Sequence, residues 1–144
     1  MIEISPATDE EVFEVTADPA IWDAISDDGD GEPSMDFVWQ TSEWIRLAGR
    51  VGGKLIGVIM LHDYEDGEMI HVNVLPGFRT QYAPEFVRQS LQYAVSPTYA
   101  EIPDSLPNIQ RFAEHQGFVR VSGSESIGQK NGKPYQLGLY KRVA

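Results

Sequence analysis

Residues 73–83 combine features that can hold an anionic group. An alternating apolar pattern runs into this segment, Pro76 and Gly77 predict a turn inside it, and an amphipathic helix is predicted over residues 83–95. The first N–H groups of a helix lack intrahelical partners, and the aligned peptide dipoles favour negative charge there. Arg79 adds a cation at the same junction. The segment therefore predicts a docking site for an anion between a strand and a helix.

The composition fits a single globular domain over residues 1–144, with 42% hydrophobic and 23% charged residues. The formal net charge is −11 and the pI is about 4.5. This balance argues against nucleic acid as a partner, because phosphate binding needs clustered Lys and Arg. It permits a cationic partner, such as an amine substrate or a basic protein face, and it also serves solubility.

The chain has no Cys, which excludes disulfides and thiolate metal sites. Its first residues lack the basic and apolar regions of a signal peptide, and its longest apolar stretch, residues 55–61, is too short to span a membrane. We therefore expect a cytoplasmic protein without a membrane partner. The acidic loop over residues 26–34 fails as a calcium loop, because Pro33 or Phe37 falls where the motif needs Gly or Glu. No metal site is predicted.

Local signals define the elements on the N-terminal side of this junction. Ile2 and Ile4 predict a short strand, Thr8 and Glu11 form a capping-box pattern, and Asp18-Pro19 is a second helix start. Residues 44–51 and 54–62 are predicted strands joined by a Gly-Gly hairpin turn, and residues 69–75 are a strand with bulky side chains on both faces.

On the C-terminal side we predict strands over residues 98–102, 118–121 and 135–140, with a turn at Asn131-Gly132. Ser105 is predicted to cap a helix that ends at Gly117 and turns Ile109, Phe112 and Ala113 inward. The predicted order is one strand, two helices, three antiparallel strands, helix, strand, helix and two strands. Such alternation indicates an α/β domain with a mixed central sheet and helices on both faces.

This order resembles the GNAT acetyltransferase superfamily, the acyl-CoA N-acyltransferase fold, over nearly the whole chain. Three segments carry the resemblance. Residues 74–79 are similar to the family's fourth strand and the start of its pyrophosphate loop, residues 108–118 to its last helix and closing Gly-Phe, and residues 131–135 to the hairpin before its last strand. The resemblance implies a single GNAT-like domain.

The resemblance implies acetyl-CoA as cofactor. Its pyrophosphate would lie on backbone N–H groups before the helix, and its pantetheine arm would pair with the backbone around Val74. The implied cofactor-binding residues are Val74, Arg79, Gln81, Tyr82 and Ala83. The sequence departs from the family pattern at Tyr82 and at Pro84, where small residues are usual. Tyr82 narrows the backbone approach and Pro84 lacks an N–H donor. Arg79 can alternatively be a surface residue paired with an acid.

The family's chemistry also implies a base that deprotonates an amine and an acid that protonates the leaving thiolate. His71 and Glu68 are the candidate bases, because both lie at the predicted strand over residues 69–75. Each has a structural alternative: a hydrogen-bonded histidine and a residue at the end of a turn. Ala113 stands at the family's usual acid position, so Tyr135 or Tyr140 is the candidate substitute. The tryptophans are read as core or rim aromatics.

Two functions from different classes follow. The first is a divergent acyl-CoA-dependent N-acetyltransferase acting on an unknown small-molecule or protein amine. The alternative comes from a narrower resemblance of residues 75–79, 82–86 and 111–114 to small GNAT-like proteins of short-tailed phages, which implies a non-catalytic head-assembly or virion protein with phage structural proteins as partners. Its location would be the host cytoplasm or the virion. A small-molecule binding module without turnover is a third possibility.

Overall fold

The structure is a computed structural model that describes residues 1–121 and 126–143. Its strands are β1 Glu3–Pro6, β2 Ile45–Val51, β3 Lys54–Tyr64, β4 Gly67–Val74, β5 Thr98–Pro103, β6 Val119–Arg120, β7 Ser126–Lys130 and β8 Lys133–Arg142. Its helices are α1 Asp9–Thr16, α2 Pro19–Ile25, α3 Met35–Gln40, α4 Arg79–Ser90 and α5 Pro107–His115, with short 3-10 turns η1 Pro76–Phe78 and η2 Leu91–Tyr93.

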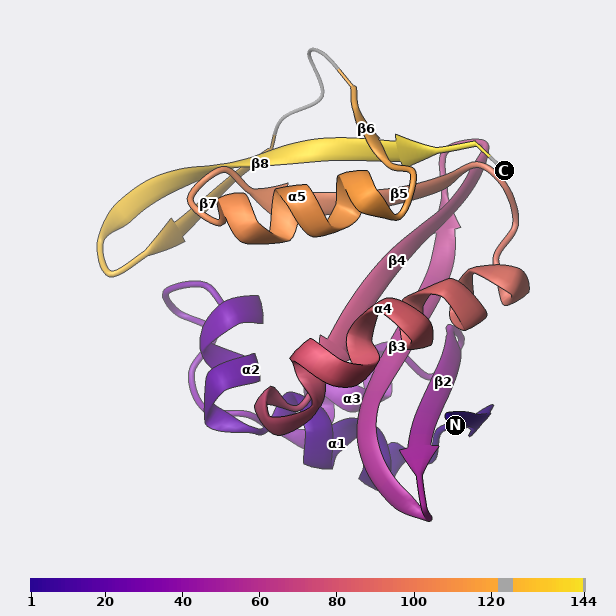
Figure 1. The fold of residues 1–144 in the computed structure, drawn as a ribbon. Helices are drawn as coiled ribbons and strands as arrows, with labels where there is room; N and C mark the ends of the chain where they lie inside the picture. The colour runs from indigo at the N-terminus through magenta and orange to yellow at the C-terminus, as the bar shows by residue number, and fades with distance from the viewer. Residues whose placement is uncertain (122–125, 144) are drawn as a thin grey trace.

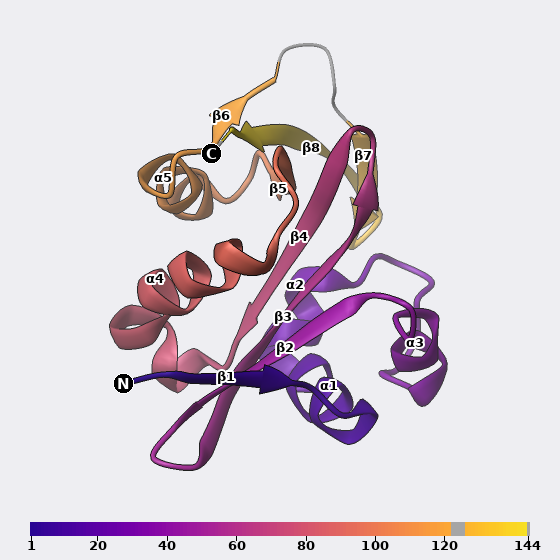
Figure 2. The same cartoon turned by 90° about the vertical axis from the view of Figure 1, so that its right-hand side faces the viewer.

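The strands form one mixed sheet in the order β1-β2-β3-β4-β5-β8-β6, with β7 paired to β8. Every neighbouring pair is antiparallel except β4 and β5. Helices α1, α2 and α3 lie on one side of the sheet and helices α4 and α5 on the other (Figures 1 and 2). The predicted α/β class, with a mixed sheet and helices on both faces, is confirmed.

Short-range signals that start elements hold in the structure. Thr8 and Glu11 form a reciprocal capping box, with the Thr8 N–H 3.0 Å from Glu11 Oε1 and the Glu11 N–H 3.1 Å from Thr8 Oγ1. Asp18 caps α2 by accepting from the Ala20 N–H at 3.0 Å. The β2–β3 hairpin turns at Gly52 and Gly53, whose φ values of 57° and 80° suit glycine.

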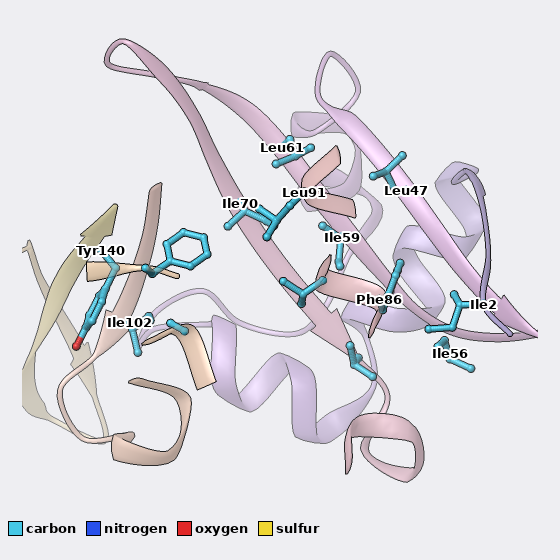
Figure 3. Packing of buried hydrophobic residues seen from close by; sticks show 14 residues of the cluster. Ile2, Leu47, Ile56, Ile59, Leu61, Ile70, Phe86, Leu91, Ile102 and Tyr140 are labelled. Atoms are coloured by element: carbon cyan, nitrogen blue, oxygen red, sulfur yellow. The ribbon is translucent and has the colours of Figure 1, made fainter. Parts of the chain in front are cut away.

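Two hydrophobic clusters cover the central strands from opposite sides. On the α4 side, Phe86 and Leu91 pack with Ile59 and Ile70 of β3 and β4 (Figure 3). On the other side, Val58 and Met60 of β3 pack with residues of α1, α2 and α3, namely Val12, Val15, Ile21 and Val38. Burial on both faces explains why the sequence of β4 carries bulk at successive positions.

Five local predictions were wrong. Helix α3 and strand β7 were missed. For α3 the reason is that residues 35–40 follow a Gly- and Pro-rich loop and gain their order by burying Val38. Helix α4 begins at Arg79 rather than at residue 83, because η1 starts the turn at Pro76 and runs directly into it. The N-cap of α5 is Leu106 rather than Ser105, since Pro107 occupies the first helical position, and Ile109 is 48% exposed rather than inward.

The parallel contact between β4 and β5 is held by a close backbone approach at Gly67. A Cβ atom built on Gly67 would lie 1.8 Å from the Pro97 carbonyl oxygen. The Glu68 N–H donates to that same oxygen at 3.1 Å, and the pairing continues only through Glu68–Thr98 and Met69–Tyr99. Gly67 is therefore required where the two strands meet.

We expect Gly67→Ala to lower the free energy of unfolding by about 2–3 kcal/mol, because the added methyl group displaces the Pro97 carbonyl. Gly77→Ala is the matched control, since nothing lies within 4 Å of its Cβ position, and it should change stability by no more than about 0.5 kcal/mol. Urea unfolding followed by circular dichroism measures both. Equal stability of the two variants would contradict the close approach.

Candidate functional site

The sheet opens between β4 and β5. Their pairing is limited to Glu68–Thr98 and Met69–Tyr99, and beyond Met69 the two strands diverge (Figures 1 and 2). Val72 is 40% exposed although it lies in a central strand. The opening therefore exposes an edge of β4 that a sheet normally covers.

The backbone groups along this opening are those of the even-numbered residues of β4. The Leu75 N–H donates across to Ile56 of β3 at 2.9 Å, whereas the Glu68 N–H donates towards β5. Because peptide directions alternate along a strand, the N–H and C=O groups of Val72 and Val74 face the opening. An extended ligand with amide groups can pair with this edge as an added strand.

Arg79 lies at the end of the opening, at the start of α4. Its Nε donates to the Val74 carbonyl oxygen at 2.9 Å, so this carbonyl already has a partner. That bond uses one of the five guanidinium donors, and the others can serve an anion. The Lys54 ammonium lies 5.5 Å from the centroid of the neighbouring Phe78 ring. Two cations therefore flank this helix start in a strongly acidic protein.

The predicted anion-binding loop is part of a helix. Gln81, Tyr82 and Ala83 belong to α4, and Tyr82 and Ala83 are partly buried against the core on that side of the sheet. The N–H groups of Phe78 and Arg79 donate to the carbonyls of Leu75 and Pro76 within the turn. The junction thus offers fewer free N–H groups than a glycine-rich loop, and its anion affinity depends more on side chains.

His71 lies on the α1–α3 side of β4 and belongs to an aromatic cluster with His62 and Trp44. The Nε2 atoms of His71 and His62 are 2.9 Å apart. The Trp44 ring centroid lies 4.3 Å from that of His62 and 5.2 Å from that of His71. The cluster joins β3, β4 and the residue before β2, and places an imidazole beside the opening.

His71 is uncharged at neutral pH. Burial, followed by the electrostatic effect of His62, lowers the pKa of His71 from the usual 6.5 to about 4. A neutral imidazole has one nitrogen lone pair that can accept a proton. His71 thus has the protonation state that a base needs before a reaction.

The other candidate catalytic residues are not brought together with His71. Glu68 is an odd number of residues from His71, so its side chain lies on the opposite face of β4, where its buried carboxylate accepts from the Val95 N–H at 2.7 Å. Tyr135, on the same face as His71, donates its hydroxyl proton to Asp27. Burial and this hydrogen bond raise the pKa of Tyr135 to about 12, so it is a weak acid at neutral pH. Tyr140 is buried in the core on the α4 side.

The acidic loop over residues 26–34 is fastened to the β7–β8 hairpin. Asp28 accepts from the N–H groups of Asn131 at 2.8 Å and Gly132 at 2.7 Å, and these bonds lower its pKa. Lys130 donates to the Ser26 carbonyl at 2.5 Å. A cleft of about 450 Å³ lies at this contact. Within residues 1–121 and 126–143, no group of three or more His, Asp or Glu could hold a metal ion.

Solved structures share the overall fold of this chain. Spermidine N-acetyltransferase from Vibrio cholerae, in complex with CoA and spermine, is 14% identical with a TM-score of 0.80, over 99% of this chain and 95% of that chain. Ribosomal-protein-alanine N-acetyltransferase from Brucella melitensis is 16% identical with a TM-score of 0.74, over 99% of each chain. A GNAT-family acetyltransferase from Streptococcus pneumoniae is 11% identical with a TM-score of 0.70, over 99% of both.

The chain has the GNAT fold. No family model matches it, and no curated protein matches its sequence. Across the described ranges on either side of residues 122–125, no helix is both long and apolar enough to cross a membrane.

Sequence reasoning missed three residues near the opening between β4 and β5 and the start of α4. His62 and Trp44 lie beside His71, and Lys54 lies beside the start of α4. His62 and His71 are diagonal neighbours, because His62 is opposite Met69 and His71 is opposite Met60. Only the register of the β3–β4 hairpin reveals this pair. For Lys54, the sequence contains no comparable signal.

The lowered pKa of His71 predicts a pH-dependent stability. A histidine with a depressed folded-state pKa contributes stability above pH 6.5, and this contribution is lost as the pH falls from 6.5 towards 4. We expect a loss of about 3 kcal/mol from this residue over that window. In His71→Gln the free energy of unfolding, measured by urea titration at several pH values, should fall less steeply there. Parallel curves for the two proteins would contradict the prediction.

Proposed function

We propose that the protein is an acyl-CoA-dependent N-acetyltransferase that acts on an amine. The observation that carries the proposal is the unpaired edge of β4 beyond Met69, with His71 on the same strand segment and Arg79 at its end. The GNAT fold supports the proposal at the level of architecture. Fold alone leaves function open, so the residues of the site carry the argument.

The residues present fit a coenzyme A group in part. The edge groups of Val72 and Val74 suit the amides of a pantetheine arm, except for the Val74 carbonyl, which is already bonded to Arg79. Arg79 and Lys54 supply positive charge for phosphates, in place of the N–H groups that the turn uses internally. A Cβ built on Gly77 would meet nothing within 4 Å, so the space beside this turn is open.

The bound cofactor would supply a thioester carbonyl. Acetyl transfer from it to an amine would form a C–N bond and break the C–S bond, and the coenzyme A thiolate released would take a proton from solvent. The attacking nitrogen becomes acidic as it bonds to carbon, and His71, neutral at pH 7, accepts its proton. With a pKa near 4, His71 is a weak base, so we place its contribution in that transfer and not in deprotonating a free ammonium ion in advance.

The net charge of the protein favours an amine as the acceptor of the acetyl group. A net charge of −11 attracts amines, which are cations before they react. The solved neighbours include an enzyme crystallised with spermine and one named for a ribosomal-protein alanine, which is consistent with an amine acceptor here. A panel of small-molecule and protein amines tests this acceptor class.

The phage-assembly alternative receives no support from the solved structures named above, which are N-acetyltransferases. It remains a prediction from the sequence, motivated by Tyr82, Pro84 and Ala113 at positions where the family has other residues. A folded protein that binds no acetyl-CoA at millimolar concentration would favour it over the enzyme.

We expect Arg79→Ala to weaken acetyl-CoA binding about 10-fold in isothermal titration calorimetry, because a charge-assisted phosphate contact is lost. Arg88→Ala is the matched control. It removes the same charge from the same helix, but Arg88 pairs with Glu85 on the exposed surface. The control should bind within about twofold of the wild type. An equal effect of both substitutions would indicate long-range charge and not a site.

Turnover tests the role of His71. We expect His71→Gln to lower the rate of acetyl transfer by about 10²-fold, as measured by thiol release with a panel of amines, while acetyl-CoA affinity stays within about twofold. The affinity measurement is the control for folding. Unchanged turnover in the variant would remove His71 from the mechanism and leave its histidine pair as a structural feature.

A further inference from the structure

We propose that His62 is a positioning residue for His71: it fixes the tautomer of His71, so that Nδ1 is the nitrogen that accepts a proton. The proposal deepens the function proposed above and rests on it for any effect on turnover. The tautomer itself is a property of the folded chain and can be tested without a reaction.

The hydrogen bonds determine the tautomer of His62 first and, through it, the tautomer of His71. The Nδ1 atom of His62 lies 2.9 Å from the Asp63 carbonyl oxygen. A carbonyl oxygen only accepts, so Nδ1 of His62 carries a proton. In a neutral imidazole the other nitrogen is then an acceptor, which makes Nε2 of His62 the acceptor in the 2.9 Å contact. The donor is Nε2–H of His71, and Nδ1 of His71 keeps the lone pair.

The surroundings of the pair favour this assignment. Its neighbours on the same side of β3 and β4 are Met60, Tyr64, Met69 and Asn73. Burial raises the pKa of Tyr64, so it is uncharged at neutral pH. The Asn73 amide donates to the Val58 carbonyl at 3.3 Å and so has its own partner. Besides burial, His62 is the neighbour that lowers the pKa of His71.

Trp44 completes the arrangement. Its ring is nearly parallel to that of His71, at an interplanar angle of 15°, and is tilted by 31° from that of His62. Stacking against both rings restricts their rotation about the side-chain bonds, which keeps the two Nε2 atoms facing each other. The negative face of an indole also attracts a neighbouring cation, so it favours the imidazolium form.

The proposed role of His71 is to take one proton from the amine. The amine nitrogen gives its proton to Nδ1 of His71 while the C–N bond forms. The Nε2–H of His71 keeps its bond to Nε2 of His62 during this transfer. Solvent takes the proton from His71 after the product leaves. His62 itself need not change its protonation state.

The direct test is the nitrogen chemical shift of each imidazole in ¹⁵N-labelled wild-type protein at pH 7, recorded by long-range ¹H–¹⁵N correlation. We expect a protonated Nδ1 and unprotonated Nε2 in His62, and the reverse in His71. A His62 protonated on Nε2, or a His71 protonated on Nδ1, would overturn the proposal. This readout does not depend on any acetyl transfer, so it separates a failure of the tautomer from a failure of the proposed function.

Two substitutions test the positioning role. His62→Phe keeps an aromatic ring against Trp44 but removes the acceptor, whereas His62→Gln retains a carbonyl oxygen that can accept from His71. In long-range ¹H–¹⁵N spectra at pH 7, we expect Nδ1 of His71 to stay unprotonated in His62→Gln, as in the wild type, and both tautomers of His71 to be populated in His62→Phe. For turnover we expect a decrease of about 10-fold in kcat with little change in KM for the Phe variant, and recovery to within about threefold for the Gln variant.

The same single tautomer of His71 in both variants would overturn the role of His62 as an acceptor. Wild-type protein that shows the expected tautomers but transfers no acetyl group would contradict the enzymatic proposal alone. Thermal unfolding of both variants is the control, because a loss of folding would lower kcat and affinity together, whereas a lost acceptor acts on kcat.

Discussion

The brevity of the β4–β5 contact is the constraint on which the site depends. Parallel strands normally pair along their length, but here only the pairs Glu68–Thr98 and Met69–Tyr99 form before the strands separate. Gly67 allows the Pro97 carbonyl to approach closely, and the Glu68 carboxylate binds the Val95 N–H from the incoming chain. These contacts hold β4 and β5 together where they pair, so the open edge of β4 beyond Met69 is a stable part of the fold and not a frayed end.

The two faces of the opening have different chemistry. On the α4 side, Arg79 and Lys54 lie where β4 ends and can hold negative charge. On the α1–α3 side, burial keeps His71 neutral and its bond to His62 orients its ring. One strand therefore separates a region suited to an anion from a region suited to a proton acceptor. A ligand that lies along β4 would reach both.

Much of the fold could be predicted because its signals are local. Thr8 with Glu11, Asp18 with Pro19 and the Gly52-Gly53 turn act within four residues, and each worked as expected. The start of α4 could not be placed, because Pro84 resembles a first-turn residue and only the packing of Phe86 and Val87 shows that it lies inside the helix. His71 was identified as a candidate from its residue type and strand. Its partner His62 depends on hairpin register, which no short window of sequence contains.

The contact between the acidic loop and the β7–β8 hairpin joins residues more than a hundred positions apart, through Asp28, Lys130 and the hairpin backbone. The loop belongs to the half of the molecule that ends with β4, and the hairpin to the half that begins with β5. The two halves are thus joined by the β4–β5 pairs, by the hydrophobic cluster beneath α4 and α5, and on the other side of the sheet by this loop-to-hairpin contact. Residues distant in the sequence therefore hold the two halves together on both faces of the sheet, and the opening lies between these attachments.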